Sequence, residues 1–132
     1  MIGLDTNILL RLTLQDDETQ SRQAISLIGG LTPEDPGFVN SAVLLEFIWT
    51  ARRHAKMSRE ELKSILSGFL DSDNLVLEDE NVIELALDEM ERSEEEFADI
   101  FIAHKNRELG CRITMTFDKR AADRVPGMEL LA

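Results

Sequence analysis

Short apolar runs alternate with longer amphipathic segments along the whole chain. The apolar runs predict strands at residues 2–4, 38–39, 75–77, 112–117 and 128–131. The amphipathic segments predict helices between them, at residues 7–14, 17–28, 41–55, 58–70, 80–92, 98–109 and 119–124. Strands that alternate with helices form a parallel sheet covered by helices on both faces. We therefore predict an α/β fold of the α/β/α type, with helices packed on a central, mostly parallel sheet.

Polar residues and glycines mark where several of these helices begin and end. Ser41 is a suitable N-cap for the helix that follows it, and residues 58–61 (Ser-Arg-Glu-Glu) match the capping box. Gly110 ends another helix. Neither a linker nor an internal repeat interrupts the chain, whose 132 residues are the usual length of one domain. We therefore predict a single domain over residues 1–132.

The composition excludes several classes of protein. The chain is 43% hydrophobic and 30% charged, which is typical of a globular domain and too apolar for a disordered chain. Cys111 is the single cysteine, so no intrachain disulfide can form, as is usual in the reducing cytosol. The N-terminus lacks the basic region of a signal peptide, and no apolar run reaches the roughly 20 residues of a membrane-spanning helix. We therefore expect a cytoplasmic protein that does not enter a membrane.

The net charge of −12 comes from one segment of the chain. Residues 71–99 contain 13 acidic residues and a single base, Arg92, whereas acids and bases balance in the remainder. Negative charge spread over a whole surface argues against a nucleic-acid partner, but a local acidic segment leaves that question open. We expect residues 71–96 to face away from a nucleic acid, where they could attract a basic segment of a partner protein.

Four carboxylates differ from the other acids because they lie within apolar runs: Asp5, Glu46, Asp99 and Asp118. No Lys or Arg lies within three residues of Asp5 or Asp99, although burying an unpaired carboxylate is strongly unfavourable. A hard divalent cation would supply the missing positive charge. Asp5 and Asp118 each follow a predicted strand and precede a helix, which places them at the carboxyl edge of a parallel sheet, where ligands bind. Glu46 and Asp99 fall early in their helices, so all four could meet at that edge.

Each of these acids also has a purely structural explanation. Asp5, Asp99 and Asp118 can cap a helix or stabilise its first turn, and Glu46 can lie on a polar helix face. A shared metal site accounts for all four positions at once, whereas the structural explanations treat each of them separately. The His and Cys residues are too scattered to predict a zinc site.

Four segments of the chain resemble the successive motifs of PIN-domain nucleases, most closely the VapC-type toxins of bacterial and archaeal toxin–antitoxin pairs. These segments are residues 5–11 (DTNILLR), 41–46 (SAVLLE), 97–103 (FADIFIA) and 116–119 (TFDK). The likeness covers the full chain in order, and each segment contains one of the four acids. The resemblance implies a parallel sheet of about five strands between helices.

The resemblance also implies roles for individual residues. It implies a catalytic acidic pocket that binds Mg²⁺, or alternatively Mn²⁺, formed by Asp5, Glu46, Asp99 and Asp118. Thr116 matches a hydroxyl position that supports such a pocket, and Asn7 matches a polar position after the first Asp. The family further implies an endoribonuclease that hydrolyses RNA phosphodiester bonds, is inhibited by a cognate antitoxin and forms a homodimer.

Three basic residues adjoin the acids in the sequence: Arg11, Lys119 and Arg120. Because affinity for RNA arises largely from phosphate contacts, we predict that these three bind the RNA backbone. Trp49 and the phenylalanines are expected in the core instead of serving as platforms for base stacking.

Two other classes of function fit the acidic pattern less well. A phosphotransfer receiver needs its acceptor Asp after the third strand, where this chain has Glu78-Asp79. A haloacid-dehalogenase-like phosphatase needs a second Asp two residues after the first, where this chain has Asn7. A PIN-like binding module without catalysis is a third alternative, and the intact acids argue against it.

Overall fold

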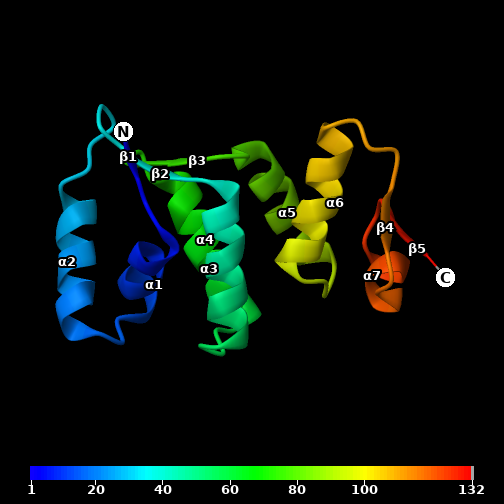
Figure 1. The fold of residues 1–132 in the computed structure, drawn as a ribbon, viewed down its shortest axis with the longest axis horizontal. Coiled ribbons are helices and arrows are strands. Elements are labelled where there is room, and N and C mark those ends of the chain that lie inside the picture. The colour runs from blue at the N-terminus through cyan, green and yellow to red at the C-terminus, as the bar shows by residue number, and fades with distance from the viewer. Residues whose placement is uncertain (132) are drawn as a thin grey trace. The chain divides into compact units, whose positions relative to one another are not determined.

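The computed structural model describes residues 1–131 and divides into two compact units, Met1–Asp79 and Glu80–Ala132 (Figure 1). The first unit contains three strands and four helices. In chain order these are β1 (Ile2–Gly3), α1 (Thr6–Leu14), α2 (Glu18–Gly29), β2 (Gly37–Val39), α3 (Ser41–Arg53), α4 (Arg59–Asp71) and β3 (Leu75–Leu77).

The three strands of the first unit form one parallel sheet in the order β1-β2-β3. Ile2 pairs with Gly37, which in turn pairs with Leu75. Because the strands are parallel, their carboxyl ends lie at the same edge, and the chain leaves that edge at Leu4, Asn40 and Glu78. This edge therefore carries the residues that begin α1 and α3.

Helices α1, α3 and α4 bury apolar faces in the core of the first unit. The largest fully buried side chains of this core are Leu9, Val39, Leu44, Phe47, Leu62 and Leu66. The Phe47 ring packs against the Phe69 ring with a centroid separation of 5.9 Å. Two residues expected in the core are exposed: Trp49 is 54% exposed and Phe117, in the second unit, is 78% exposed. Aromatic character alone therefore overestimated burial, because Trp49 lies on an exposed face of α3 and Phe117 lies in the connection between β4 and α7.

Side-chain caps fix where the helices of the first unit begin. Ser58 Oγ accepts a hydrogen bond from the Glu61 backbone N–H at 3.1 Å, as the capping box predicts. For α3 the predicted cap is wrong by one residue. Asn40 Oδ1 accepts from the Val43 N–H at 2.8 Å, and Ser41 is the first helical residue.

We expect Ser58→Ala to lower the free energy of unfolding by about 1 kcal/mol, because it leaves the Glu61 N–H without its cap. Urea denaturation followed by circular dichroism measures the change. Ser64→Ala, at an exposed position of the same helix, is the matched control and should be neutral or slightly stabilising. Equal destabilisation by both substitutions would contradict the capping role.

The described part of the second unit, residues 80–131, contains three helices and two strands. In chain order these are α5 (Glu80–Arg92), α6 (Phe97–Glu108), β4 (Thr114–Thr116), α7 (Lys119–Arg124) and β5 (Met128–Leu130). Strands β4 and β5 pair in parallel, with Thr114 opposite Met128. Ala103 of α6 packs with Ala121 and Val125 at α7, so an apolar contact joins these two helices.

The structure confirms the α/β fold class and the positions of the five predicted strands, and each strand pairing is parallel. The strand predicted at residues 112–117 is shorter, since β4 covers Thr114–Thr116. Within residues 1–131, no helix is long and apolar enough to cross a membrane.

Candidate metal centre

Asp118 begins α7 and is held by two hydrogen bonds. Its Oδ1 accepts from the Ala121 backbone N–H at 3.0 Å, which makes Asp118 the N-cap of the helix. Its own backbone N–H donates to Thr116 Oγ1, also at 3.0 Å. The hydroxyl of Thr116 thus fixes the backbone at Asp118, just after the end of β4.

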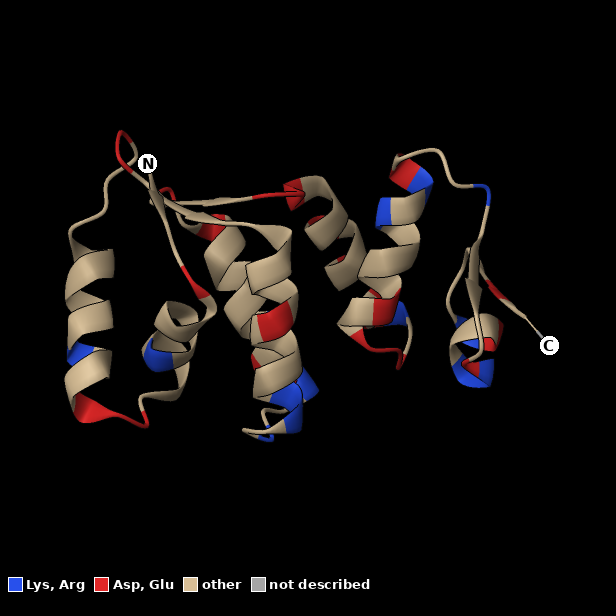
Figure 2. Ribbon diagram, viewed as in Figure 1, with Lys and Arg blue, Asp and Glu red and all other residues tan. Residues whose placement is uncertain are grey.

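Asp99 lies in the first turn of α6 and faces the same pocket as Asp118. This pocket has a volume of about 200 Å³, and its lining residues come from the segment before α6 and from the starts of α6 and α7. They are Glu94, Glu95, Glu96, Asp99, Asp118, Arg120 and Ala121. Figure 2 shows the acidic residues in red where the chain leads into α6. Residues 94–96, which belong to the segment predicted to face away from a nucleic acid, line this pocket.

The pKa of Asp99 is raised above its ordinary value of 3.8. Burial of the carboxyl group is the largest cause, and repulsion from Asp118, Glu95 and Glu96 follows. Both effects disfavour the charged form, and a bound cation would reverse them by adding a compensating positive charge. The pocket thus concentrates negative charge in a partly desolvated place.

Carboxylate oxygens are the donors that hard divalent cations prefer, so the chemistry of this pocket fits Mg²⁺ or Mn²⁺. Within the described part of the chain, no three His, Cys, Asp or Glu side chains are arranged to hold a metal ion. Mg²⁺ commonly binds through one or two carboxylates and completes its shell with water and substrate phosphate. A pair such as Asp99 and Asp118 meets that requirement.

Asp5 and Glu46 belong to the first unit. Asp5 lies just beyond the carboxyl end of β1, and its Oδ1 accepts from the Thr6 N–H at 2.8 Å as the N-cap of α1. Glu46 is exposed on α3, beside the fully buried Phe47. Asp5 and Asp118 therefore do cap helices, as the structural explanation predicted. Both caps use Oδ1, which is compatible with cation binding through Oδ2.

Asn7 and Arg11 lie on α1 and line a cavity of about 350 Å³ between α1 and α2. The Arg11 guanidinium donates through Nε to Gln20 Oε1 at 2.6 Å and through Nη1 to Asp16 Oδ1 at 3.0 Å. The charge of Arg11 is thus partly balanced by Asp16, which weakens its attraction for a phosphate.

Lys119 and Arg120 are the first two residues of α7, and both are exposed. Arg120 Nε lies 3.3 Å from Glu95 Oε1, so this guanidinium already has an acidic partner. Lys119 is the simpler candidate for a phosphate contact, because it directly follows Asp118.

Sequence reasoning missed Glu95, which is only 4% exposed. In a run of three glutamates it looks like part of a solvated face, and its neighbours Glu94 and Glu96 are indeed exposed. Its own segment carried no signal of this, because Glu95 lies outside α6 and its charged partners, Arg120 and Arg124, come from α7.

Two further acids of the acidic segment have a structural role in the first unit. Glu78 Oε1 accepts from the Ser41 backbone N–H at 2.9 Å, and the Ser41 hydroxyl donates to Asp79 Oδ2 at 2.5 Å. These bonds tie the end of β3 to the start of α3. The carboxylates of Glu78 and Asp79 therefore both accept hydrogen bonds from Ser41.

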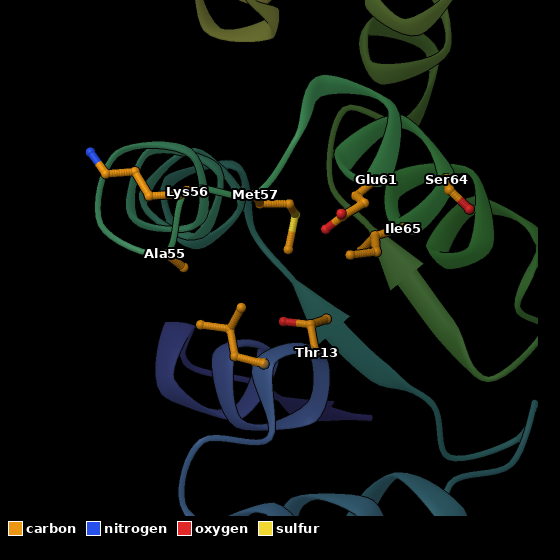
Figure 3. A pocket seen from close by; sticks show the side chains of 8 residues that line it. Thr13, Ala55, Lys56, Met57, Glu61, Ser64 and Ile65 are labelled. Carbon is orange, nitrogen blue, oxygen red and sulfur yellow. The ribbon is translucent and has the colours of Figure 1, made fainter.

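The first unit also has a cavity of about 560 Å³ between the end of α1 and the turn that joins α3 to α4 (Figure 3). Thr13, Met57 and Ile65 contribute to its lining. Because Thr13 is near the opposite end of α1 from Asp5, this cavity is separate from the acidic positions.

We expect Asp99→Asn to raise the free energy of unfolding at pH 7. Since the pKa of Asp99 is raised by folding, the folded state binds more protons than the unfolded chain between the two pKa values. The stability contributed by this residue therefore falls as pH rises above 3.8 and stays low beyond the folded pKa. Urea titrations should show that Asp99→Asn has a higher free energy of unfolding than the unaltered chain at neutral pH. Below pH 3.8 this difference should become smaller. If the stability difference between Asp99→Asn and the unaltered chain did not change with pH, the raised pKa of Asp99 would not be its cause.

Comparison with known protein families agrees with the site chemistry. The sequence profile of the PIN domain matches residues 2–127, nearly the whole chain. Among curated proteins, no sequence matches this chain. PIN domains are generally nucleases and often depend on Mg²⁺, so the receiver and phosphatase alternatives are set aside. The parallel strands, the carboxylate pocket and the match over residues 2–127 identify this chain as a member of the PIN domain family.

Proposed function

We propose that this chain is a Mg²⁺-dependent endoribonuclease and the toxin of a toxin–antitoxin module, inhibited by its cognate antitoxin. The observation that carries the proposal is the pocket shared by Asp99 and Asp118, where burial of the carboxyl group and then repulsion from Asp118 raise the pKa of Asp99. PIN-family membership supports the nuclease activity, and the VapC-like motifs around the four acids support the toxin role.

The proposed catalytic and metal-binding residues are Asp5, Glu46, Asp99 and Asp118. The similarity of their flanking motifs to those of PIN nucleases supports the assignment of all four to one active site in a single domain over residues 1–132. Within the second unit, support also comes from the pocket that Asp99 and Asp118 share. Asn7 and Thr116 are proposed as supporting residues.

Residues of the chain would contribute to phosphodiester hydrolysis in three ways. When bound, a divalent ion lowers the pKa of a water molecule and neutralises charge on the phosphate. Asp99 and Asp118 would hold that ion. Asp118 is oriented for this role because its backbone N–H donates to Thr116 Oγ1 and its Oδ1 accepts from the Ala121 N–H. Lys119, with Arg11 and Arg120, would bind RNA phosphates and place the scissile bond.

The proposal is tested by RNA cleavage with the purified full-length chain. We expect cleavage of structured RNA with Mg²⁺ or Mn²⁺, loss of cleavage with EDTA, and recovery when excess Mg²⁺ is added. Asp5→Asn should remove the activity, whereas Asp73→Asn, at an exposed turn of the first unit, removes the same charge and should retain it. RNA cleavage in the presence of EDTA would contradict the proposed mechanism. Full cleavage activity of the Asp5→Asn variant would contradict it as well.

The toxin role has a separate test in cells. We expect induction of the chain to arrest bacterial growth, and Asp5→Asn to abolish the arrest. A small open reading frame beside the gene should encode the antitoxin, and its co-expression should restore growth and yield a stable complex. We further propose that the protein is cytoplasmic. We also propose that it forms a homodimer, and light scattering of the purified protein measures this oligomeric state. Growth unaffected by the active nuclease would contradict the toxin role alone.

A further inference from the structure

Glu95 is a buried carboxylate at the edge of the acidic pocket. The residue is 4% exposed, although it lies in the segment just before α6 and is flanked by exposed glutamates. A carboxylate rarely stays buried without positive partners, because its desolvation must be offset. The partners of Glu95 therefore indicate what it does.

Two arginines of α7 supply that positive charge. Glu95 Oε1 lies 3.3 Å from Arg120 Nε and 3.7 Å from Arg124 Nη1. The two arginines are four residues apart and so lie on one face of α7. Their side chains are 58% and 56% exposed, so the carboxylate is the desolvated member of the cluster. One buried acid thus holds one face of α7 against the start of α6.

The elements joined in this way are those that carry the two acids of the pocket. Asp99 lies four residues after Glu95, in the first turn of α6, and Asp118 caps α7 two residues before Arg120. Repulsion between Asp99 and Asp118 acts to separate these helix ends. The ion pairs of Glu95 oppose that separation near the pocket, while Ala103, Ala121 and Val125 pack α6 against α7 elsewhere.

We propose that Glu95 is a positioning residue that holds Asp118 near Asp99 through Arg120 and Arg124, and so sets the affinity of the pocket for a divalent cation. This inference rests on the proposed function, because the cation is the one that the nuclease uses. Glu95 acts through the arginines and needs no contact with the ion.

The test measures Mn²⁺ binding to the full-length chain without RNA, by titration calorimetry or electron paramagnetic resonance. We expect Glu95→Gln to raise the Kd for Mn²⁺ by about 10-fold or more, the range found when residues that orient metal ligands are removed. Glu94→Gln is the matched control, because Glu94 lines the same pocket and carries the same charge but is exposed. Its effect should be clearly smaller. Equal effects would show that charge alone matters and would overturn the positioning role.

The Arg120→Gln variant distinguishes a positioning role from a simple effect of charge, because the two predict opposite changes in Mn²⁺ affinity. Removing a positive charge beside the pocket should tighten Mn²⁺ binding if only charge matters, whereas loss of the Glu95 contact should weaken it. We expect weaker binding, and tighter binding would overturn the proposal. Because Arg120 is largely exposed, this variant keeps the test valid if Glu95→Gln fails to fold.

The outcome for the unaltered protein separates this inference from the proposed function. If the unaltered chain does not bind Mn²⁺, both fail. If it binds Mn²⁺ and cleaves RNA while Glu95→Gln and Arg120→Gln bind Mn²⁺ equally well, only the role of Glu95 is overturned.

Discussion

Asp99→Asn should slow Mg²⁺-dependent RNA cleavage by at least about 100-fold, the upper end of the loss seen when residues that merely orient metal ligands are removed. The amide cannot supply the negative charge that holds the ion, and it removes one of the two acids of the pocket. The same variant should be more stable than the unaltered chain at neutral pH, because burial of a charged carboxylate and its repulsion by nearby acids, which raise the pKa of Asp99, are both removed. A loss of activity together with a gain in stability would indicate a functional carboxylate, because removal of a structural carboxylate should lower stability.

Initial cleavage rates on a labelled structured RNA, at saturating Mg²⁺ and neutral pH, measure the effect. Asp123→Asn is the matched control, since Asp123 is an exposed acid on α7 outside the lining of the pocket. We expect its rate to stay within about twofold of the unaltered chain, because exposed charges interact weakly through water. A rate for Asp99→Asn close to that of Asp123→Asn would remove Asp99 from the catalytic site.

Phe47→Ala should lower the free energy of unfolding by about 3–5 kcal/mol, a large share of the roughly 5–15 kcal/mol of a typical domain. The Phe47 side chain is fully buried on α3 and packs against Phe69, so its removal leaves a cavity and an unpaired ring. A loss of that size should lower the Tm by about 10 °C or more. Thermal and urea unfolding followed by circular dichroism measure both quantities.

Trp49→Ala is the control on the same helix. Trp49 is larger than Phe47 but 54% exposed, and its ring contacts His54 edge-on at 4.9 Å. Its removal should cost clearly less than the removal of Phe47, because about half of the Trp49 surface stays in water on folding and no closed cavity is left. If Trp49→Ala destabilised the chain as much as Phe47→Ala, the core of the first unit would have to include Trp49.

Local sequence patterns predicted the elements of this chain well. The period of apolar residues located the strands and helices, because that period depends on backbone geometry and not on distant contacts. The exact boundaries were less predictable. Asn40 and not Ser41 caps α3, since Glu78 and Asp79, far away in sequence, engage Ser41. Strand β4 is short because pairing with β5 covers only Thr114–Thr116.

The candidate site was predictable where its signal lies within a single segment. The apolar flanks of Asp99 and Asp118 distinguished them from the solvated acids, and the structure brings these two to one pocket. The part played by Glu95 was not predictable, because its burial results from contacts with α7, 25 residues away in the chain. Likewise, only the structure shows that Asp16 and Glu95 already engage Arg11 and Arg120.

The α/β class, the order of strands and helices, and the carboxylates that lie in apolar surroundings could all be predicted from the sequence, because each depends on residues that are neighbours in the chain. Long-range packing was needed to show which of the two aromatics of α3 is buried, which acids share a pocket and that they repel each other. Electrostatic energy depends on the distance through space and on the local dielectric, and both are set only when segments remote in sequence pack together.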